Sequence, residues 1–148
     1  MAENHDVTVL NNLIRTTLDS YKGFTDAAEE TGHQHSQFFS QMAQERSQVA
    51  SQMQAQVEAL GGEPEDSSSY SAAAHRGFMD LKQAVMGQSD QAVIEEVERG
   101  EDYIKEKYET ALQDDELSPS TRQIIEQAYQ SIRRGHDQAS ALKHQMEG

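Results

Sequence analysis

Residues 94–112 read IEEVERGEDYIKEKYETAL, and the apolar residues of this stretch recur every three or four positions. They are Ile94, Val97, Ile104, Tyr108 and Ala111. A period of three to four, and not two, is typical of one face of an α-helix. The same spacing recurs along residues 7–28, 38–60 and 125–146. Glu101 stands in the middle of the apolar stripe, where a charged residue needs an explanation.

The breaks between these patterns divide the chain into four long helices and one short one. Helix-ending and helix-starting signals stand at Gly32, Gly61-Gly62, Gly87 and Ser118-Pro119. Between the second and third long helices, a polar loop leads into a short amphipathic helix from about Tyr70 to Met86. We therefore expect a single all-α domain over residues 7–148, preceded by a flexible N-terminus at residues 1–6.

The lengths of the connections predict how the helices are arranged. Tight turns join the first helix to the second and the third long helix to the fourth, so each pair should form an antiparallel hairpin. Each long helix spans roughly 40 Å, and the segment between the hairpins is long enough to return over that distance. We expect a four-helix bundle with a short crossover helix between its second and third long helices. An up-down bundle with a broken third helix is the competing topology.

The composition argues against several classes of function. The formal net charge of −14 disfavours binding to nucleic acid or to an anionic membrane surface, and it is compatible with a basic partner or with cations. The chain has no Cys, so disulfides and thiolate metal sites are absent. No apolar run approaches the ~18 residues that membrane insertion requires, and the start lacks the features of a secretory signal. We expect a cytoplasmic protein.

Polar residues fall at one height in the expected bundle. Counted from the turns, or from the chain end for His136, four residues differ by only about 3 Å along the bundle axis: Tyr21, Glu45, Glu101 and His136. A carboxylate on an apolar stripe costs several kcal/mol to bury without a partner. The candidate partners for Glu45 and Glu101 are a metal ion, Arg133, a protonated His136, or water.

Three stretches resemble a known family: Leu60-Gly-Gly-Glu-Pro-Glu-Asp66, His75-Arg-Gly-Phe-Met-Asp-Leu-Lys82 and Glu98-Arg-Gly-Glu-Asp102. They are similar to a bacterial family of small four-helix-bundle proteins of the ferritin-like superfamily, described as a domain of unknown function. The resemblance runs from about Leu10 to Leu142. It implies a ferritin-like bundle, and it implies no established activity.

The ferritin-like resemblance also implies a ligand pattern, from which this sequence departs. Di-iron members use a Glu from each of two helices and Glu-x-x-His from each of the other two. Here Tyr21 stands at the first Glu position, and Gln48 follows Glu45 where the first His is expected. Arg133 precedes His136 where the second Glu-x-x-His has its Glu. The remaining Glu position is filled by Glu101 or Glu98, which lie one turn apart.

Two hypotheses for the function remain open, and neither assigns a catalytic residue. In the first, a non-enzymatic, stress- or envelope-associated bundle binds a protein partner or a second copy of itself. Its centre is then a buried structural layer without a cofactor. In the second, a metal-binding oxidoreductase or metal-storage protein holds one divalent ion (iron, manganese or zinc).

Both hypotheses assign a role to the polar residues at the centre of the expected bundle. The metal would be held by Glu45, Glu101 and His136, with Tyr21 and Glu98 nearby. The structural layer would comprise Tyr21, Glu45, Gln48, Glu98, Glu101, Arg133 and His136. The guanidinium of Arg133 can replace the positive charge of a metal ion, so it favours the structural layer.

Glycines lie near the same level, at Gly23, Gly100 and Gly135. Each costs about 1 kcal/mol relative to Ala inside a helix. They either relieve crowding where helices meet or shape a small cavity beside the polar layer.

Overall fold

The computed structural model of the chain describes residues 2–29, 36–66 and 90–147. Within these ranges the protein has four α-helices and no strand. The helices are α1 (Ala2–Glu29), α2 (Ser36–Ala59), α4 (Asp90–Leu112) and α5 (Pro119–Glu147). The all-helical class and the four long helices predicted from the sequence are thereby confirmed. The short helix expected over residues 70–86 lies outside the described residues.

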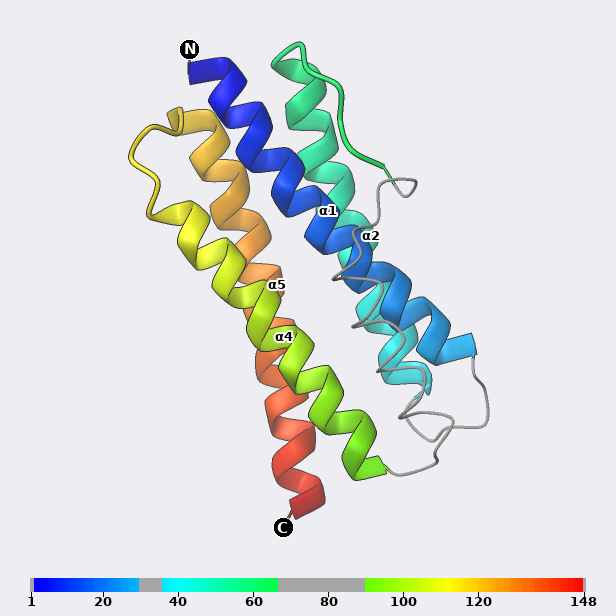
Figure 1. The fold of residues 1–148 in the computed structure, drawn as a ribbon. Helices are drawn as coiled ribbons and strands as arrows, with labels where there is room; N and C mark the ends of the chain where they lie inside the picture. Colours follow the sequence, from blue (N-terminus) through cyan, green and yellow to red (C-terminus); the bar gives the residue numbers. More distant parts are fainter. Residues whose placement is uncertain (1, 30–35, 67–89, 148) are drawn as a thin grey trace.

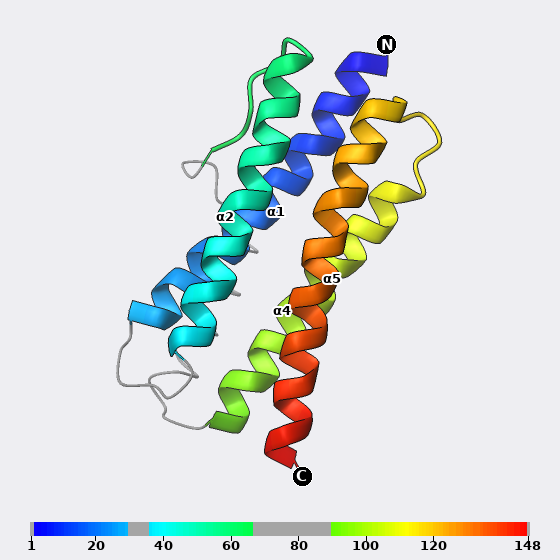
Figure 2. The ribbon, with the colours of Figure 1, turned by 180° about the vertical axis from the view of Figure 1, so that it is seen from behind.

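The helices form two antiparallel pairs that pack side by side (Figure 1). α1 lies along α2 and α4 lies along α5, while α2 also contacts α5 and α1 also contacts α4. Both views show α2 and α4 running in the same direction, so α2 ends and α4 begins at opposite ends of the bundle (Figures 1 and 2). None of the described helices has the length and apolar character needed to cross a bilayer.

The local sequence explains where α2 ends and α5 begins. Gly61 has φ of 84°, a left-handed conformation that Gly adopts without steric cost. Its amide donates to the carbonyl of Glu58, and the amide of Gly62 donates to the carbonyl of Val57, which is the hydrogen-bond pattern of a Schellman motif. At the other connection, α5 begins at Pro119, as Ser118-Pro119 predicted.

The first turns of α1 are part of the bundle. The helix begins at Ala2, whereas the sequence predicted a flexible segment over residues 1–6. Asp6 is fully buried, and its carboxylate accepts hydrogen bonds from Ser118, from the amide at 3.2 Å and from Oγ at 2.5 Å. This contact ties the start of α1 to the start of α5, a long-range pairing that local sequence cannot indicate.

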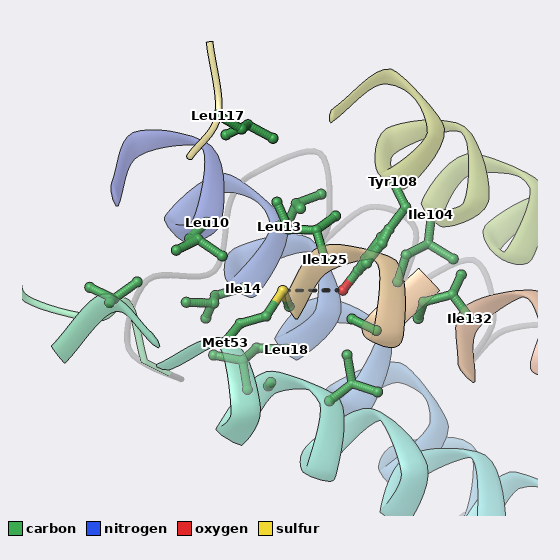
Figure 3. Packing of buried hydrophobic residues seen from close by; sticks show 14 residues of the cluster. Leu10, Leu13, Ile14, Leu18, Met53, Ile104, Tyr108, Leu117, Ile125 and Ile132 are labelled. Carbon is green, nitrogen blue, oxygen red and sulfur yellow. Dashed lines mark hydrogen bonds between the residues drawn. The ribbon is translucent and has the colours of Figure 1, made fainter. Parts of the chain in front are cut away.

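The buried apolar side chains form two clusters. The larger cluster fills the half of the bundle nearer to the chain's N-terminus and includes Leu10, Ile14, Met53, Tyr108 and Ile125 (Figure 3). The smaller cluster comprises Phe24, Phe39, Met42, Ala43, Val97 and Ala139. Every described helix contributes to each cluster, so burial of these side chains holds the two helix pairs together.

One polar contact lies inside the larger cluster. The hydroxyl of Tyr108 is 2.6 Å from Oγ1 of Thr17. It also lies 3.7 Å from the sulfur of Met53 (Figure 3). Thr17 also donates to the carbonyl of Leu13, one turn earlier in α1. Burial raises the pKa of Tyr108 well above its usual value, which keeps its hydroxyl protonated. The contact satisfies the polar ends of two side chains that are otherwise surrounded by apolar atoms.

Candidate functional site

The centre of the bundle holds a buried ion pair between Arg46 on α2 and Glu101 on α4. Nη2 of Arg46 lies 2.5 Å from Oε2 of Glu101, and the two side chains are 1% and 2% exposed. The two residues are 55 positions apart in the sequence. Since α2 and α4 lie diagonally across the bundle, the long Arg46 side chain spans the interior to reach its partner.

The ion pair separates the two apolar clusters. On each helix, the charged residue stands between a residue of the smaller cluster and a residue of the larger one. These flanking residues are Met42 and Val49 on α2, and Val97 and Ile104 on α4. The sequence predicted a polar layer in the middle of the bundle, with Glu101 or Glu98 as its residue on α4, and Glu101 is the residue that the structure buries there.

Burial dominates the electrostatics of this layer. Removal from water raises the pKa of Glu101, and the charge and hydrogen bond of Arg46 act in the opposite direction. The guanidinium lies 5.9 Å from the ring centroid of Phe24, a cation–π distance. Nη1 of Arg46 is buried without a hydrogen-bond partner among the described residues. The pair thus neutralises its own charge while leaving one donor unsatisfied.

Gly135 on α5 provides the space for this arrangement. A Cβ at this position would lie 2.5 Å from Nη2 of Arg46, 2.8 Å from Cε of Met42 and 3.3 Å from Oε2 of Glu101. A side chain here would collide with the guanidinium of Arg46 and the terminal methyl group of Met42, and it would press against Glu101. Gly100 differs, because a Cβ there would meet nothing within 4 Å. Relief of crowding therefore explains Gly135, and it does not explain Gly100.

Other residues predicted for the layer lie on the surface. Arg133 and Gln48 are exposed, so the predicted pairing of Arg133 with a buried carboxylate is corrected: Arg46 has that role. Glu98 is half-buried and accepts a hydrogen bond from Lys143 at 3.0 Å. Of the two candidates on α4, Glu101 is the one that faces the centre.

The three remaining residues of the predicted layer are half-buried. Tyr21 packs against the smaller cluster, and Glu45 lies beside Arg46 in the sequence. His136 places Nε2 2.6 Å from Oδ1 of Asp102, which is exposed. Its Nδ1 has no hydrogen-bond partner among the described residues. His136 therefore lies at the edge of the layer and faces an acidic residue at the surface.

Comparison with known proteins places the chain in a family. Residues 6–114 match the family described as a domain of unknown function, DUF2383. The chain belongs to this family. No curated protein matches the chain. The matched part of this DUF2383 chain contains Arg46 and Glu101, whereas Gly135 and His136 lie on α5, beyond the matched residues.

The residues of the layer do not fit a two-metal centre of the kind that the ferritin-like resemblance implies. Within the described part of the chain, the ligand atoms of Glu45, Glu101 and His136 do not converge to within 4.8 Å of one another. One oxygen of Glu101 is already bonded to a guanidinium, which a metal ion would have to displace. The only described group of three converging His, Asp or Glu ligands comprises His5, Asp114 and Glu116, near the start of α1.

Proposed function

We propose that this DUF2383 protein is a non-enzymatic ferritin-like bundle, a stress-associated or interaction protein whose metal centre is replaced by an ion pair. The Arg46–Glu101 contact carries the proposal, because it lies in the central layer and is almost completely buried. A guanidinium supplies the positive charge that a buried carboxylate requires. The layer then specifies how the helices pack and needs no ion.

The directions of the helices support the ferritin-like part of the proposal. Because α2 and α4 run in the same direction, α2 ends and α4 begins at opposite ends of the bundle. A long connection between two antiparallel hairpins is the arrangement of ferritin-like folds. An up-down bundle would instead place α4 antiparallel to α2.

The charge of the chain supports an interaction role. A formal net charge of −14 on 148 residues produces a negative potential that attracts basic surfaces and repels nucleic acid. We propose a protein partner with a basic surface and a cytoplasmic location. A second copy of the chain is the alternative partner, but its equal negative charge opposes association.

Metal analysis of the central layer tests the proposal. The metal content of untagged protein is measured before and after anaerobic loading with Fe²⁺, for the parent and for Glu45→Gln and His136→Ala. These two residues are half-buried, so their replacement should leave the fold intact, as circular dichroism can verify. We expect the parent and both variants to bind the same amount of iron. We also expect oxygen consumption no faster than that of free Fe²⁺.

The opposite result would establish the alternative. If the parent bound nearly one iron per chain and both variants bound none, the protein would be a metal-binding or metal-storage protein that uses Glu45, Glu101 and His136. Oxygen consumption that depends on this iron would identify an oxidoreductase. Iron that persists in both variants is bound elsewhere in the chain and leaves the ion-pair proposal standing.

A further inference from the structure

A second group of charged residues lies where α1 begins and where α4 connects to α5. Nε2 of His5 is 2.6 Å from Oδ2 of Asp114 and 3.9 Å from Oε2 of Glu116. The His5 side chain is 35% exposed, and those of the two acids are 24% and 80% exposed. The chain brings these residues together from positions 109 apart. The group is separate from the central layer and reachable from solvent.

The connection that carries both acids is held in place by its own hydrogen bonds. Oδ1 of Asp114 accepts from the amide of Glu116 at 2.9 Å. The guanidinium of Arg122 donates to the carbonyls of Leu112 and Asp114. The contact of Asp6 with Ser118 fixes the first turns of α1 against the same connection. The ligand-bearing segments are therefore ordered without an ion, which lowers the entropic cost of binding one.

The chemistry of the three side chains suits a divalent transition ion. An imidazole nitrogen and two carboxylate oxygens are ligands that Zn²⁺ accepts, and three protein ligands leave a fourth position for water. The hydrogen bond of the Asp114 side chain to the Glu116 amide lowers the pKa of Asp114, so its carboxylate stays ionised. His5 binds a metal in its neutral form, in which the ion replaces the proton between Nε2 and Oδ2.

The spacing of the ligand atoms requires little adjustment. Ligands of a tetrahedral Zn²⁺ ion with bonds of about 2.1 Å are about 3.4 Å apart. This separation falls between the present distances of 2.6 Å and 3.9 Å from Nε2 to the two carboxylate oxygens. Rotation of the exposed Glu116 side chain would bring its oxygen closer, and the short His5–Asp114 contact would open by less than an ångström.

We propose that one divalent transition ion binds to His5, Asp114 and Glu116. The bound ion links the start of α1 to the α4–α5 connection. Zn²⁺ is the ion used to test the site. The cation is coordinated at the end of the bundle, so this site goes beyond the function proposed for the central layer. Its consequence is metal-dependent stability of the N-terminal turns, because an ion that binds the folded chain stabilises it.

Calorimetric titration with Zn²⁺ tests this site in the untagged, chelator-treated full chain. We expect one Zn²⁺ per chain in the parent, and affinity lower by more than about tenfold in His5→Gln and in Asp114→Asn. The matched controls are His144→Gln and Asp115→Asn, which change exposed residues outside the group. At a hundredfold excess over Kd, the melting temperature of the parent should rise by about 5–10 °C.

Other outcomes would overturn the proposal. One is the absence of Zn²⁺ binding, and another is equal affinity in the parent, His5→Gln and Asp114→Asn. A third concerns two other histidines of the chain, His33 and His35: Zn²⁺ binding that is lost in the double variant His33→Gln/His35→Gln and retained in His5→Gln would place the ion elsewhere. Loss of Zn²⁺ binding in Glu45→Gln or His136→Ala would instead locate the ion in the central layer and contradict the proposed function as well. If the proposal holds, those two variants bind Zn²⁺ like the parent.

Discussion

Gly135 on α5 faces the guanidinium of Arg46 on α2 so closely that a methyl group at position 135 would lie 2.5 Å from Nη2. Atoms at this distance overlap, so the guanidinium of Arg46 would have to shift to admit a side chain at position 135. The helix tolerates the intrinsic cost of Gly here because the ion pair needs the space. This relationship makes Gly135 part of the central layer, although it has no side chain.

The first prediction concerns Gly135→Ala, with Gly100→Ala as its control. Overpacking costs about 1–3 kcal/mol and the gain in helix propensity returns about 1 kcal/mol, so Gly135→Ala should lower the free energy of unfolding by up to about 2 kcal/mol. Gly100 is exposed, with room for a Cβ, and its replacement should raise that energy by up to about 1 kcal/mol. Urea denaturation of both variants measures the difference. Stabilisation by both substitutions would contradict the crowding at position 135.

The second prediction separates Arg46 from Arg133. Arg46→Met leaves the Glu101 carboxylate buried without its partner and should reduce the free energy of unfolding by about 3–5 kcal/mol. Arg133→Met changes an exposed residue and should alter it by no more than about 0.5 kcal/mol. Chemical denaturation at pH 7 measures both.

A double variant completes the test of the pair. Arg46→Met/Glu101→Met removes both charges, and packed apolar side chains in their place should recover most of the loss, since such replacements are often neutral or stabilising. The single variant Glu101→Met is measured as well. If the loss of unfolding free energy in the double variant equalled the sum of the losses in Arg46→Met and Glu101→Met, Arg46 and Glu101 would not be energetically coupled.

The helical pattern predicted the position of the polar layer but not the Arg46 side chain at its centre. On α2, the interval from Met42 to Val49 is two turns, and both position 45 and position 46 fall close to the line between them. The prediction placed Glu45 inward, whereas the buried residues of α2 include Phe39, Met42, Arg46 and Val49. Hydrophobic periodicity cannot rank two adjacent charged residues, because neither contributes to the apolar signal.

The other helices show a similar ambiguity. On α4, the sequence left Glu98 and Glu101 open as the residue that faces the centre, and the structure shows that Glu101, between Val97 and Ile104, is the buried one. On α5, the buried position is Gly135 and the neighbouring His136 is half-buried. A Gly gives no apolar signal, and the need for it arises from Arg46 on another helix. Contacts between distant helices are not encoded in local spacing.

The third prediction concerns the pH dependence of stability. Asp19 on α1 is half-buried, and its Oδ1 has no hydrogen-bond partner among the described residues. Burial raises its pKa from 3.8 to about 7, opposed by the charge of Arg15. The folded chain therefore binds this proton more tightly than the unfolded chain. The resulting stabilisation is fully present below about pH 3.8 and is lost as pH rises through about 7.

Replacement of Asp19 by Asn tests this dependence. Asp19→Asn removes the ionisable group, so unfolding free energies measured at intervals from pH 4 to pH 8 should decline less steeply than in the parent. Glu101, whose pKa is also raised, leaves a remaining slope of the same sign. Asp115→Asn, at an exposed site, is the control and should keep the parental slope. An unchanged slope in Asp19→Asn would mean that the Asp19 carboxyl is solvated in the folded protein.

The fourth prediction concerns the hydrogen bonds between Asp6 and Ser118. Both oxygens of the buried Asp6 carboxylate accept hydrogen bonds from Ser118, so Asp6→Ala leaves the Ser118 amide without its partner. Hydrogen bonds to charged groups contribute about 1.5–3 kcal/mol, and the loss in Asp6→Ala should fall in or slightly above that range. Ser118→Ala removes only the hydroxyl contact and should cost about 1 kcal/mol.

Hydrogen exchange distinguishes a local effect from a global one. In Asp6→Ala, the amides of the first turns of α1 should exchange faster relative to those of the α4–α5 core, because the substitution releases the end of the helix. Asp6→Asn keeps one acceptor oxygen and should lie between the parent and Asp6→Ala in both stability and exchange. If Asp6→Ala were as stable as the parent, the contact of Asp6 with Ser118 would contribute nothing to stability, which would agree with the flexible N-terminus that the sequence predicted. A clear loss of stability in Asp6→Ala would instead show that the N-terminal turn of α1 stabilises the start of α5.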